Sequence, residues 1–278
     1  MTAPPSGLLE LAVGVAQTAG RLLTGYAGEL AAGGDLAIGS KTTATDAVSK
    51  ADRAAERLIA DRLRRARPDD GLLAEEEQAD RAGTSGLRWV VDPLDGTVNF
   101  LYGLSGWAVS IACEDADGPL VGVIHHPAAG ETFTAVRGRG AYLGARRLEV
   151  TEVAALGMAL VATGFAYDPA VRADQARDWA GLLPEVRDLR RAGSAALDLA
   201  WVAAGRMDAY LEFGLQPWDW SAGRLVVTEA GGMVTEVARA LGGERRVGLV
   251  AGGRTAHAGL VRWLDDHPRP RERAATPR

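Results

Sequence analysis

Two aspartates three residues apart lie in the segment of this chain with the clearest capacity for chemistry. The segment reads DPLDGTVNF over residues 92–100 and follows the apolar residues 89–91. A buried strand that runs into Asp92, with a turn fixed by Pro93, allows the carboxylates of Asp92 and Asp95 to converge on one point. The spacing therefore predicts paired carboxylates at the end of a strand.

The residues directly after this pair are suited to hold an anion. Gly96 lets the backbone approach a ligand closely, and the amides of Gly96 and Thr97 are expected to open a helix, whose free N–H groups bind phosphate. Carboxylates beside anion-binding amides are compatible only when a cation lies between them. Oxygen ligands without His or Cys indicate Mg²⁺, which proteins bind through one or two carboxylates together with substrate phosphate. For the aspartate pair alone, a solvated turn is the alternative interpretation.

Acidic residues also follow or precede other predicted elements. Three glutamates at 75–77 follow the apolar residues 72–74, and Asp46 and Asp52 flank a predicted helix start. Asp219 opens a predicted helix that closes with the letters EAGG. Acidic residues occur at the ends of apolar runs too often to be explained by solvent exposure alone. We therefore expect several of these side chains to lie beside the aspartate pair.

Length and composition indicate a folded globular protein. The 278 residues (29.1 kDa) allow one large domain or two of ordinary size, and 47% hydrophobic with 24% charged residues excludes a disordered chain. A net charge of −5 and a pI near 5.5 disfavour nucleic acid as the main partner. The single cysteine, Cys113, excludes an intrachain disulfide and is expected to be a buried, inert thiol.

The N-terminus indicates a cytoplasmic protein. The first basic residue is Arg21, so the charged start of a signal peptide is missing, and no apolar run approaches the ~20 residues that span a bilayer. We therefore expect no membrane partner.

Hydrophobic periodicity predicts helices packed on a large sheet in the first half and α/β layering in the second. Helices are predicted from residue 8 to a stop at 33, and over 49–68, 170–183, 194–204, 218–230 and 256–264. Strands are predicted over 72–74, 87–91, 107–113, 120–125, 132–136, 160–163, 207–213, 233–237 and 247–251.

The elements suggest a division of the chain into two domains and a tail. We predict an N-terminal α+β domain over 1–148, a C-terminal α/β domain over 149–267 and a disordered tail over 268–278. Ser49, with Asp52 three residues later, resembles the N-cap of the second helix. The outer face of that helix is rich in arginine, for which solvation is the ordinary interpretation.

Four motifs in order resemble those of the inositol monophosphatase family. DAVSKAD (46–52) matches the family's Asp-x-Val-Thr-x-x-Asp with Ser49 in place of Thr, and Glu75-Glu76 matches its Glu-Glu. Residues 92–100 match Asp-Pro-x-Asp-Gly-Thr-x-Asn-Phe, and 218–232 match Trp-Asp-x-Ala-Ala-Gly to Glu-Ala-Gly-Gly, with Ser221 at the first Ala. The resemblance covers residues 8 to 266.

The resemblance implies a metal centre of two to three Mg²⁺ ions. The implied ligands of the first ion are Glu75, Asp92 and the carbonyl of Leu94, and those of the second are Asp92, Asp95 and Asp219. A third ion would bind Glu75 through water. Thr97, hydrogen-bonded to Asp52, would orient the attacking water, and the amides of Gly96 and Thr97 would hold the phosphate.

The resemblance also implies positions that bind the alcohol part of the substrate. They are Asp95, Gly193, Ser194, Ala195, Glu212 and Asp219. Glu212 can also be read as a solvated strand end. Lys41 is open between a phosphate contact and a surface role, and Arg191 between substrate specificity and a dimer contact.

The implied activity is that of a Mg²⁺-dependent, Li⁺-sensitive phosphatase acting on a small phosphorylated polyol. Myo-inositol 1-phosphate is the preferred substrate. Histidinol phosphate is the second choice, and fructose 1,6-bisphosphate and 3′-phosphoadenosine 5′-phosphate are further alternatives. A non-enzymatic role in binding transcription machinery is the alternative of another class. The implied fold is a layered αβαβα sandwich, usually found as a homodimer.

Overall fold

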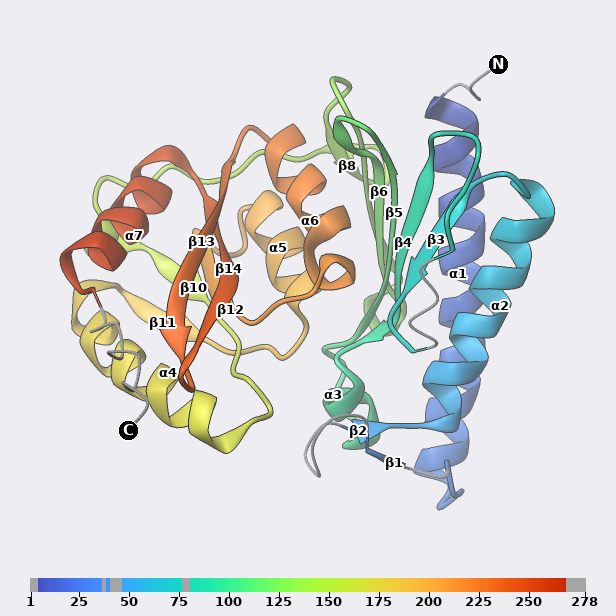
Figure 1. The fold of residues 1–278 in the computed structure, drawn as a ribbon, viewed down its shortest axis with the longest axis horizontal. Coiled ribbons are helices and arrows are strands. Elements are labelled where there is room, and N and C mark those ends of the chain that lie inside the picture. The colour runs from blue at the N-terminus through green and yellow to red at the C-terminus, as the bar shows by residue number, and fades with distance from the viewer. Residues whose placement is uncertain (1–4, 37–38, 41–46, 77–80, 269–278) are drawn as a thin grey trace, which may run out of the picture.

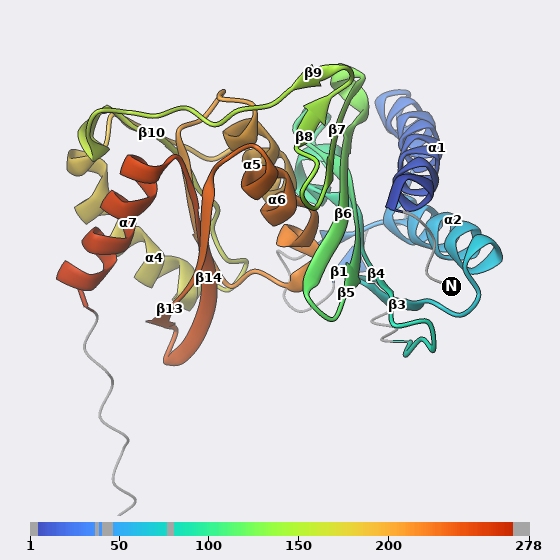
Figure 2. The same ribbon diagram turned by 90° about the horizontal axis from the view of Figure 1, so that it is seen from above.

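Two β-sheets and three layers of helices alternate along the molecule (Figure 1). This computed structural model describes residues 5–36, 39–40, 47–76 and 81–268. Helices α1 and α2 form one outer layer, α5 and α6 lie between the two sheets, and α4 and α7 cover the far side (Figures 1 and 2). The order of layers is αβαβα, which confirms the expected fold class.

The first sheet has seven strands in the order β3-β4-β5-β6-β7-β8-β9. Strand β3 pairs with β4 in parallel, and the remaining neighbours are antiparallel. The strands are β3 (Gly71–Ala74), β4 (Arg88–Asp95), β5 (Ala108–Asp115), β6 (Gly118–His126), β7 (Glu131–Val136), β8 (Ala141–Leu143) and β9 (Arg146–Arg147). A short antiparallel pair, β1 (Gly39–Ser40) and β2 (Ala47–Val48), precedes this sheet in the chain.

The two helices of the outer layer are α1 (Pro5–Ala31) and α2 (Lys50–Ala66). The second begins with a capping box, in which the Ser49 hydroxyl accepts from the amide of Ala51 and the Asp52 carboxylate accepts from the amide of Ser49. Its inner face packs into the core through alanines, Ile59 and Leu63. The predicted N-cap is therefore confirmed, and it fixes the position of Asp52.

The second sheet has five strands in the order β11-β10-β12-β14-β13. Strand β10 is parallel to both of its neighbours, and the other pairs are antiparallel. The strands are β10 (Leu160–Ala162), β11 (Asp188–Arg190), β12 (Ala209–Phe213), β13 (Met233–Leu241) and β14 (Glu244–Gly252). The outer helices α4 (Pro169–Leu182) and α7 (Arg254–Asp266) cover it.

The middle layer, formed by α5 (Ala195–Ala203) and α6 (Pro217–Glu229), is buried on both sides. Small residues allow this close packing. A Cβ on Gly122 of β6 would lie 2.9 Å from the carbonyl of Ala222, and one on Gly223 would lie 2.5 Å from a methyl of Leu199. The alanine-rich sequence of α5 is thus explained by its place between two sheets.

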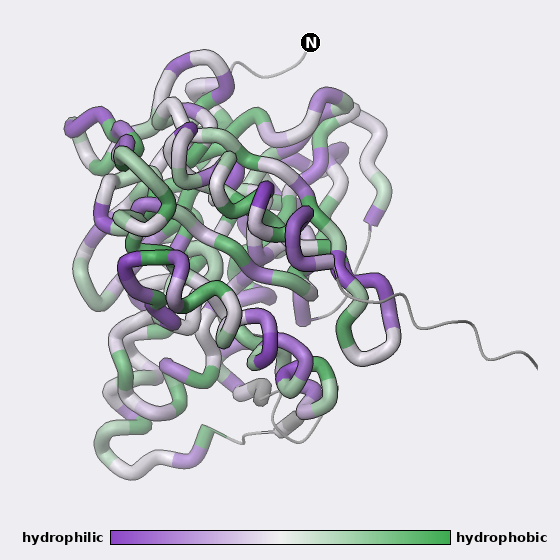
Figure 3. Tube along the Cα trace, turned by 90° about the vertical axis from the view of Figure 1, so that its left-hand side faces the viewer, coloured by the Kyte–Doolittle hydropathy of each residue, from purple (hydrophilic) through white to green (hydrophobic). Residues whose placement is uncertain are grey.

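The remaining helical segments are short. They are α3 (Thr97–Leu101), η1 (Pro127–Ala129), η2 (Leu156–Met158) and η3 (Leu183–Glu185). Seen from the side of α4 and α7, hydrophilic and hydrophobic residues are interspersed along the trace (Figure 3). None of the helices within the described ranges is both long and apolar enough to cross a membrane.

Most predicted helices and strands are present, with small shifts at their ends. The prediction missed β1, β2, β8, β9 and β11, which are only two or three residues long. It also placed a turn at Pro93, whereas β4 continues through this proline to Asp95. The division at residue 148 stays a prediction, and the tail from 269 onward lies outside the described residues.

Candidate active site

Strands β3 and β4 bring the first two acidic motifs together. Their parallel register pairs Ala74 with Val91, so the next residues, Glu75 directly after β3 and Asp92 within β4, lie side by side. Asp92 is buried, and one of its carboxylate oxygens accepts from the amide of Leu94 at 2.9 Å. Parallel pairing therefore places the two carboxylates at one sheet edge.

An irregularity in β4 turns the backbone at the aspartate pair. Asp92 pairs with Ser110 and Asp95 with Ala108, so β4 advances by three residues while β5 advances by two. Pro93 lies in this bulge, where its missing N–H costs no ladder hydrogen bond. The bulge also brings the carbonyl oxygen of Leu94 to within 3.1 Å of Oγ1 of Thr97.

Thr97 and Asp52 form a hydrogen bond between segments that are far apart in sequence. The Thr97 hydroxyl lies 2.9 Å from Oδ1 of Asp52, and both residues are buried. Oδ2 of Asp52 accepts from the amide and the hydroxyl of Ser49, at 2.8 and 2.6 Å. The capping box of α2 thus holds the carboxylate that receives the threonine hydroxyl.

Gly96 connects the aspartate pair to α3 in a conformation that favours glycine. Its φ is +95°, and a Cβ there would lie 2.7 Å from the carbonyl of Gly106. As the N-cap of α3, Gly96 precedes Thr97, the first residue of the helix. The amides of Gly96 and Thr97 thus lie at the N-terminal end of α3, and their role as an anion site stays a prediction.

Asp95 is held by the N-terminus of α5. Its Oδ2 accepts from the Ser194 hydroxyl at 2.7 Å and from the Ala196 amide at 2.6 Å. Burial raises the pKa of Asp95 to about 6, although these hydrogen bonds act in the opposite direction, and the charge of Glu75 adds to the rise. Asp95 therefore links the two halves of the chain.

Glu212 contributes a further, half-buried carboxylate to the same site. Its Oε2 accepts from the Tyr210 hydroxyl at 2.8 Å. Burial raises the pKa of Glu212 to about 7, and the charge of Asp95 acts in the same direction. A Cβ on Gly164 would lie 2.1 Å from Oε1 of Glu212, so a larger residue there would displace this carboxylate. These contacts do not fit a solvated strand end.

Asp219 lies in the first turn of α6. Its carboxylate accepts from the amide of Gln216 at 2.7 Å. Burial, followed by the charges of Glu75 and Asp95, holds the pKa of Asp219 well above its usual range. Asp219 is therefore electrostatically coupled to both of these predicted metal ligands.

The donor set suits a hard divalent cation. It consists of carboxylate and carbonyl oxygens from Glu75, Asp92, Leu94, Asp95 and Asp219, which are the ligand types that Mg²⁺ takes. Within the described ranges, no three Asp, Glu, His or Cys side chains already surround a point that could hold an ion. The pKa values of Asp95 and Asp219 are raised by burial and by the negative charges of neighbouring carboxylates. A divalent cation at this position would offset those negative charges.

Sequence reasoning missed three residues that the structure brings to this site. The side chain of Asn99 binds the carbonyls of Gly106 and Ala192, and the amide of Ala196 binds Asp95. Asp198 is buried beside the site, where burial and the charges of Glu212 and Asp95 hold its pKa well above the usual range. Asn99 belongs to the motif at 92–100, but the spacing of residues within that motif does not predict that its side chain binds Gly106 and Ala192.

The other predicted site residues lie in the segment 190–195 or outside the residues that the structure describes. Gly193 has a φ of +97°, and Ser194 caps α5 with its hydroxyl 3.2 Å from the amide of Leu197. Arg191 is exposed. Its positive charge acts to lower the pKa values of Glu212 and Asp198, but burial outweighs it and both pKa values are raised. Lys41 and Asp46 lie outside the described residues.

Comparisons with known proteins agree with these motifs. The model of the inositol monophosphatase family matches residues 5–269. Inositol-1-monophosphatase SuhB of Mycobacterium tuberculosis is 43% identical over 250 residues, which cover 84% of this chain and 86% of the relative. The Nus factor SuhB of Escherichia coli K12 is 40% identical over 231 residues, covering 82% and 85%.

Solved structures give the same result. The crystal structure of the extragenic suppressor protein suhB from Bartonella henselae has a TM-score of 0.83 and 40% identity, covering 93% of this chain and 98% of that one. Motifs, fold and overall similarity thus agree, and the chain belongs to the inositol monophosphatase family.

Proposed function

We propose that this protein is a Mg²⁺-dependent phosphomonoesterase that hydrolyses myo-inositol 1-phosphate to myo-inositol and phosphate. The observation that carries the proposal is the hydrogen bond of Thr97 to Asp52, next to the buried carboxylates of Asp92 and Asp95. The name of the M. tuberculosis relative, inositol-1-monophosphatase, supports this substrate.

Two to three Mg²⁺ ions are part of the proposal. Glu75, Asp92 and the Leu94 carbonyl would hold the first, Asp92, Asp95 and Asp219 the second, and Glu75 through water a weaker third. Bound there, these ions supply neutralisation of the phosphate, a lowered pKa of bound water and stabilisation of the leaving alkoxide.

Thr97 orients the attacking water in this proposal. Its hydroxyl hydrogen can be directed to Asp52, because Ser49 fixes the other oxygen of that carboxylate and leaves Oδ1 for the threonine. The lone pairs of Thr97 Oγ1 then accept a hydrogen from water and aim its oxygen at phosphorus. The amides of Gly96 and Thr97 hold the phosphate in place.

The alcohol part of the substrate would bind at the meeting point of β12, α5 and α6. Asp95, Gly193, Ser194, Ala195, Glu212 and Asp219 are the proposed contacts. Glu212 suits hydroxyl recognition because its pKa of about 7 allows the carboxyl group to accept or to donate a hydrogen bond. Such directional contacts favour a polyol over an apolar alcohol.

The decisive test is phosphate release from a panel of substrates. The panel contains myo-inositol 1-phosphate, histidinol phosphate, fructose 1,6-bisphosphate and 3′-phosphoadenosine 5′-phosphate, each with Mg²⁺, with EDTA and with added Li⁺. We expect Mg²⁺-dependent, Li⁺-inhibited preference for the inositol ester. Preference for histidinol phosphate would keep the metal chemistry and reassign the substrate, whereas turnover that is unaffected by EDTA would refute the mechanism.

Binding to transcription machinery is a second candidate function. It is favoured by the E. coli relative, which is named a Nus factor. An Asp219→Asn variant separates the two roles, because a binding role should survive the loss of a metal ligand while hydrolysis should not.

A homodimer in the cytoplasm is also proposed. Tyr102 and Leu104, two neighbouring large hydrophobic side chains that follow α3, are 80% and 57% exposed and are the proposed contact between protomers. Light scattering coupled to size-exclusion chromatography measures the oligomeric state, and a dimer that Tyr102→Ser and Leu104→Ser dissociate would support this contact.

A further inference from the structure

The outward face of α2 carries an unusual concentration of positive charge. At about 100° of rotation per residue, Lys50, Arg53, Arg57, Arg64 and Arg65 fall within an arc of about 120°. All five are exposed. The stripe is about 22 Å long at 1.5 Å per residue. We call these five residues the basic face of α2.

Acidic residues do not balance this charge on the helix itself. Asp52 and Glu56 of α2 are buried, so Asp61 is the one exposed acidic residue between 50 and 66. Asp61 contacts Arg64 at 3.3 Å, and with both side chains more than half exposed this pair is weak. The face therefore keeps a net charge of about +4 on a chain whose total is −5.

Packing does not explain the basic face either. Helix α2 lies at the outer edge of the molecule, with its other side on the first sheet (Figures 1 and 2). Lys50 lies over the ring of Tyr26 at 5.5 Å, whereas within the described ranges the side chains of Arg53, Arg57 and Arg65 make no hydrogen bond or ion pair. Like charges three and four residues apart repel one another and cost helix stability, although Arg64 and Arg65 lie in the last turn of α2, where the helix dipole favours a cation.

The chemistry of this face points to one kind of partner. We propose that the basic face of α2 binds the phosphate backbone of a nucleic acid, independently of base sequence. Guanidinium groups bind phosphate oxygens in a two-pronged way, and a row of them neutralises a chain of phosphates. An acidic protein fits less well, because stable protein interfaces have an apolar centre and the large exposed hydrophobic side chains of the described residues all lie outside α2.

This inference goes beyond the proposed phosphatase activity. In the proposed function the amides of Gly96 and Thr97 take one phosphate group next to buried carboxylates, whereas the basic face is exposed on the outer side of α2. The net charge of the chain disfavours nucleic acid as the main partner, but a local patch acts within the Debye length of about 10 Å, over which distant charges are screened.

The test measures binding of a fluorescent single-stranded 20-nucleotide RNA to the full chain at salt concentrations from 0.05 to 0.2 M. Five phosphate contacts predict a slope of about −3.5 in log K against log salt, a loss of roughly 100-fold over this range. The variant Arg57→Gln/Arg64→Gln/Arg65→Gln leaves two contacts and should lower the slope to about −1.4, a loss of under 10-fold.

A matched variant controls for the overall change of charge. Arg187→Gln/Arg245→Gln/Arg262→Gln removes three exposed arginines from other surfaces and should keep the wild-type slope. Phosphate release and thermal unfolding, measured on both variants, report whether the active site and fold are intact, so failure of the phosphatase proposal is seen separately. Equal loss of RNA binding in both variants, or no salt-dependent binding at all, overturns the proposal. Tighter binding to poly-glutamate or to anionic lipid vesicles than to RNA also overturns it.

Discussion

The side-chain amide of Asn99 lies 2.7 Å from the carbonyl oxygen of Ala192, a residue 93 positions later in the chain. The same nitrogen donates to the carbonyl of Gly106 at 2.6 Å. Asn99 belongs to α3, whose first amides are the proposed phosphate site, and Ala192 precedes the segment that binds Asp95 through Ser194. One amide group thus ties the proposed phosphate side of the site to the proposed polyol side.

Removing this amide should impair catalysis more than folding. Asn99→Ala leaves two carbonyls without a donor, at a cost of about 1–3 kcal/mol, and allows the 192–194 segment to shift. Because small displacements of positioning groups are costly, we expect kcat/KM for the inositol ester to fall by roughly 10- to 100-fold. Thr151→Val, which removes a hydrogen bond to Asp208 that involves none of the proposed site residues, is the control and should lose stability alone. Equal kcat/KM losses in both variants would contradict a positioning role for Asn99.

Asp92→Asn should abolish hydrolysis even at saturating Mg²⁺. Asp92 is the carboxylate that both principal ions would share, so an amide there removes charge from two positions at once. Phosphate release, together with Mg²⁺ binding by calorimetry, checks this expectation. Near-normal turnover of the variant would exclude Asp92 as the shared ligand.

Gly164→Ala should weaken substrate binding without abolishing chemistry. The new Cβ would lie 2.1 Å from the Glu212 carboxylate, so that side chain must move. If Glu212 binds a substrate hydroxyl, KM should rise about 10-fold or more while kcat changes little. Gly157→Ala is the control, since its Cβ meets only the carbonyl of Glu185 at 3.8 Å. An unchanged KM in Gly164→Ala would place the polyol elsewhere.

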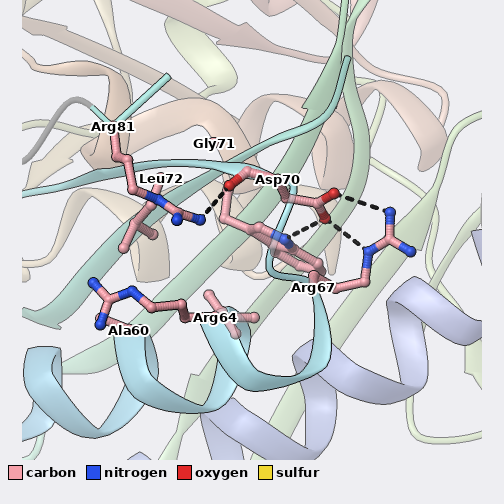
Figure 4. A pocket seen from close by; sticks show the side chains of 9 residues that line it. Ala60, Arg64, Arg67, Asp70, Gly71, Leu72 and Arg81 are labelled. Carbon is pink, nitrogen blue, oxygen red and sulfur yellow. Dashed lines mark hydrogen bonds and ion pairs between the residues drawn. The ribbon is translucent and has the colours of Figure 1, made fainter. Parts of the chain in front are cut away.

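The environment of Asp70 predicts acid-sensitive stability. Burial raises the pKa of Asp70, but hydrogen bonds from Arg67, Ser85 and Trp89 together outweigh it, so the net pKa is lowered. Figure 4 shows the two-pronged contact of Arg67, with both N–O distances at 2.9 Å. A lowered pKa means that the stabilisation is complete above the unfolded value of about 3.9 and is lost as pH falls through the folded pKa.

Urea unfolding of wild type and Asp70→Asn across pH tests this sign. At pH 7 the variant should be less stable by about 2 kcal/mol, the usual worth of hydrogen bonds to a charged group. The difference should shrink as pH falls below about 4, because the wild-type carboxylate then takes up a proton. A difference that stays constant down to the lowest pH at which the protein folds would refute the assignment.

A buried ion pair fixes the far side of the second sheet. Arg239 of β13 contacts both carboxylate oxygens of Asp178 of α4 at 2.8 and 2.9 Å, and both side chains are 7% exposed. Asp178→Ala leaves the guanidinium buried without its partner and should lower the free energy of unfolding by about 3–5 kcal/mol. The double variant Asp178→Leu/Arg239→Met should regain much of this loss, and chemical denaturation measures both. A double variant no more stable than the single one would contradict this reading.

The sequence alone determined the local part of this protein. The apolar runs, the capping pair Ser49 and Asp52, and the spacing of Asp92, Asp95 and Gly96 are set within a few residues of backbone, so periodicity and turn chemistry predict them. The same local information identified the carboxylates that the structure gathers at one edge of the first sheet.

Only the tertiary structure decided which distant groups meet. The sequence gives no signal that Ala196 binds Asp95, that Asn99 binds Ala192, or that Asp198 is buried beside Glu212. It also hid the continuation of β4 through Pro93, since the loss of one amide is tolerated only where a bulge leaves it without a partner. Contacts of this kind depend on how sheets and helices pack, and packing is a property of surfaces that are assembled from separate segments.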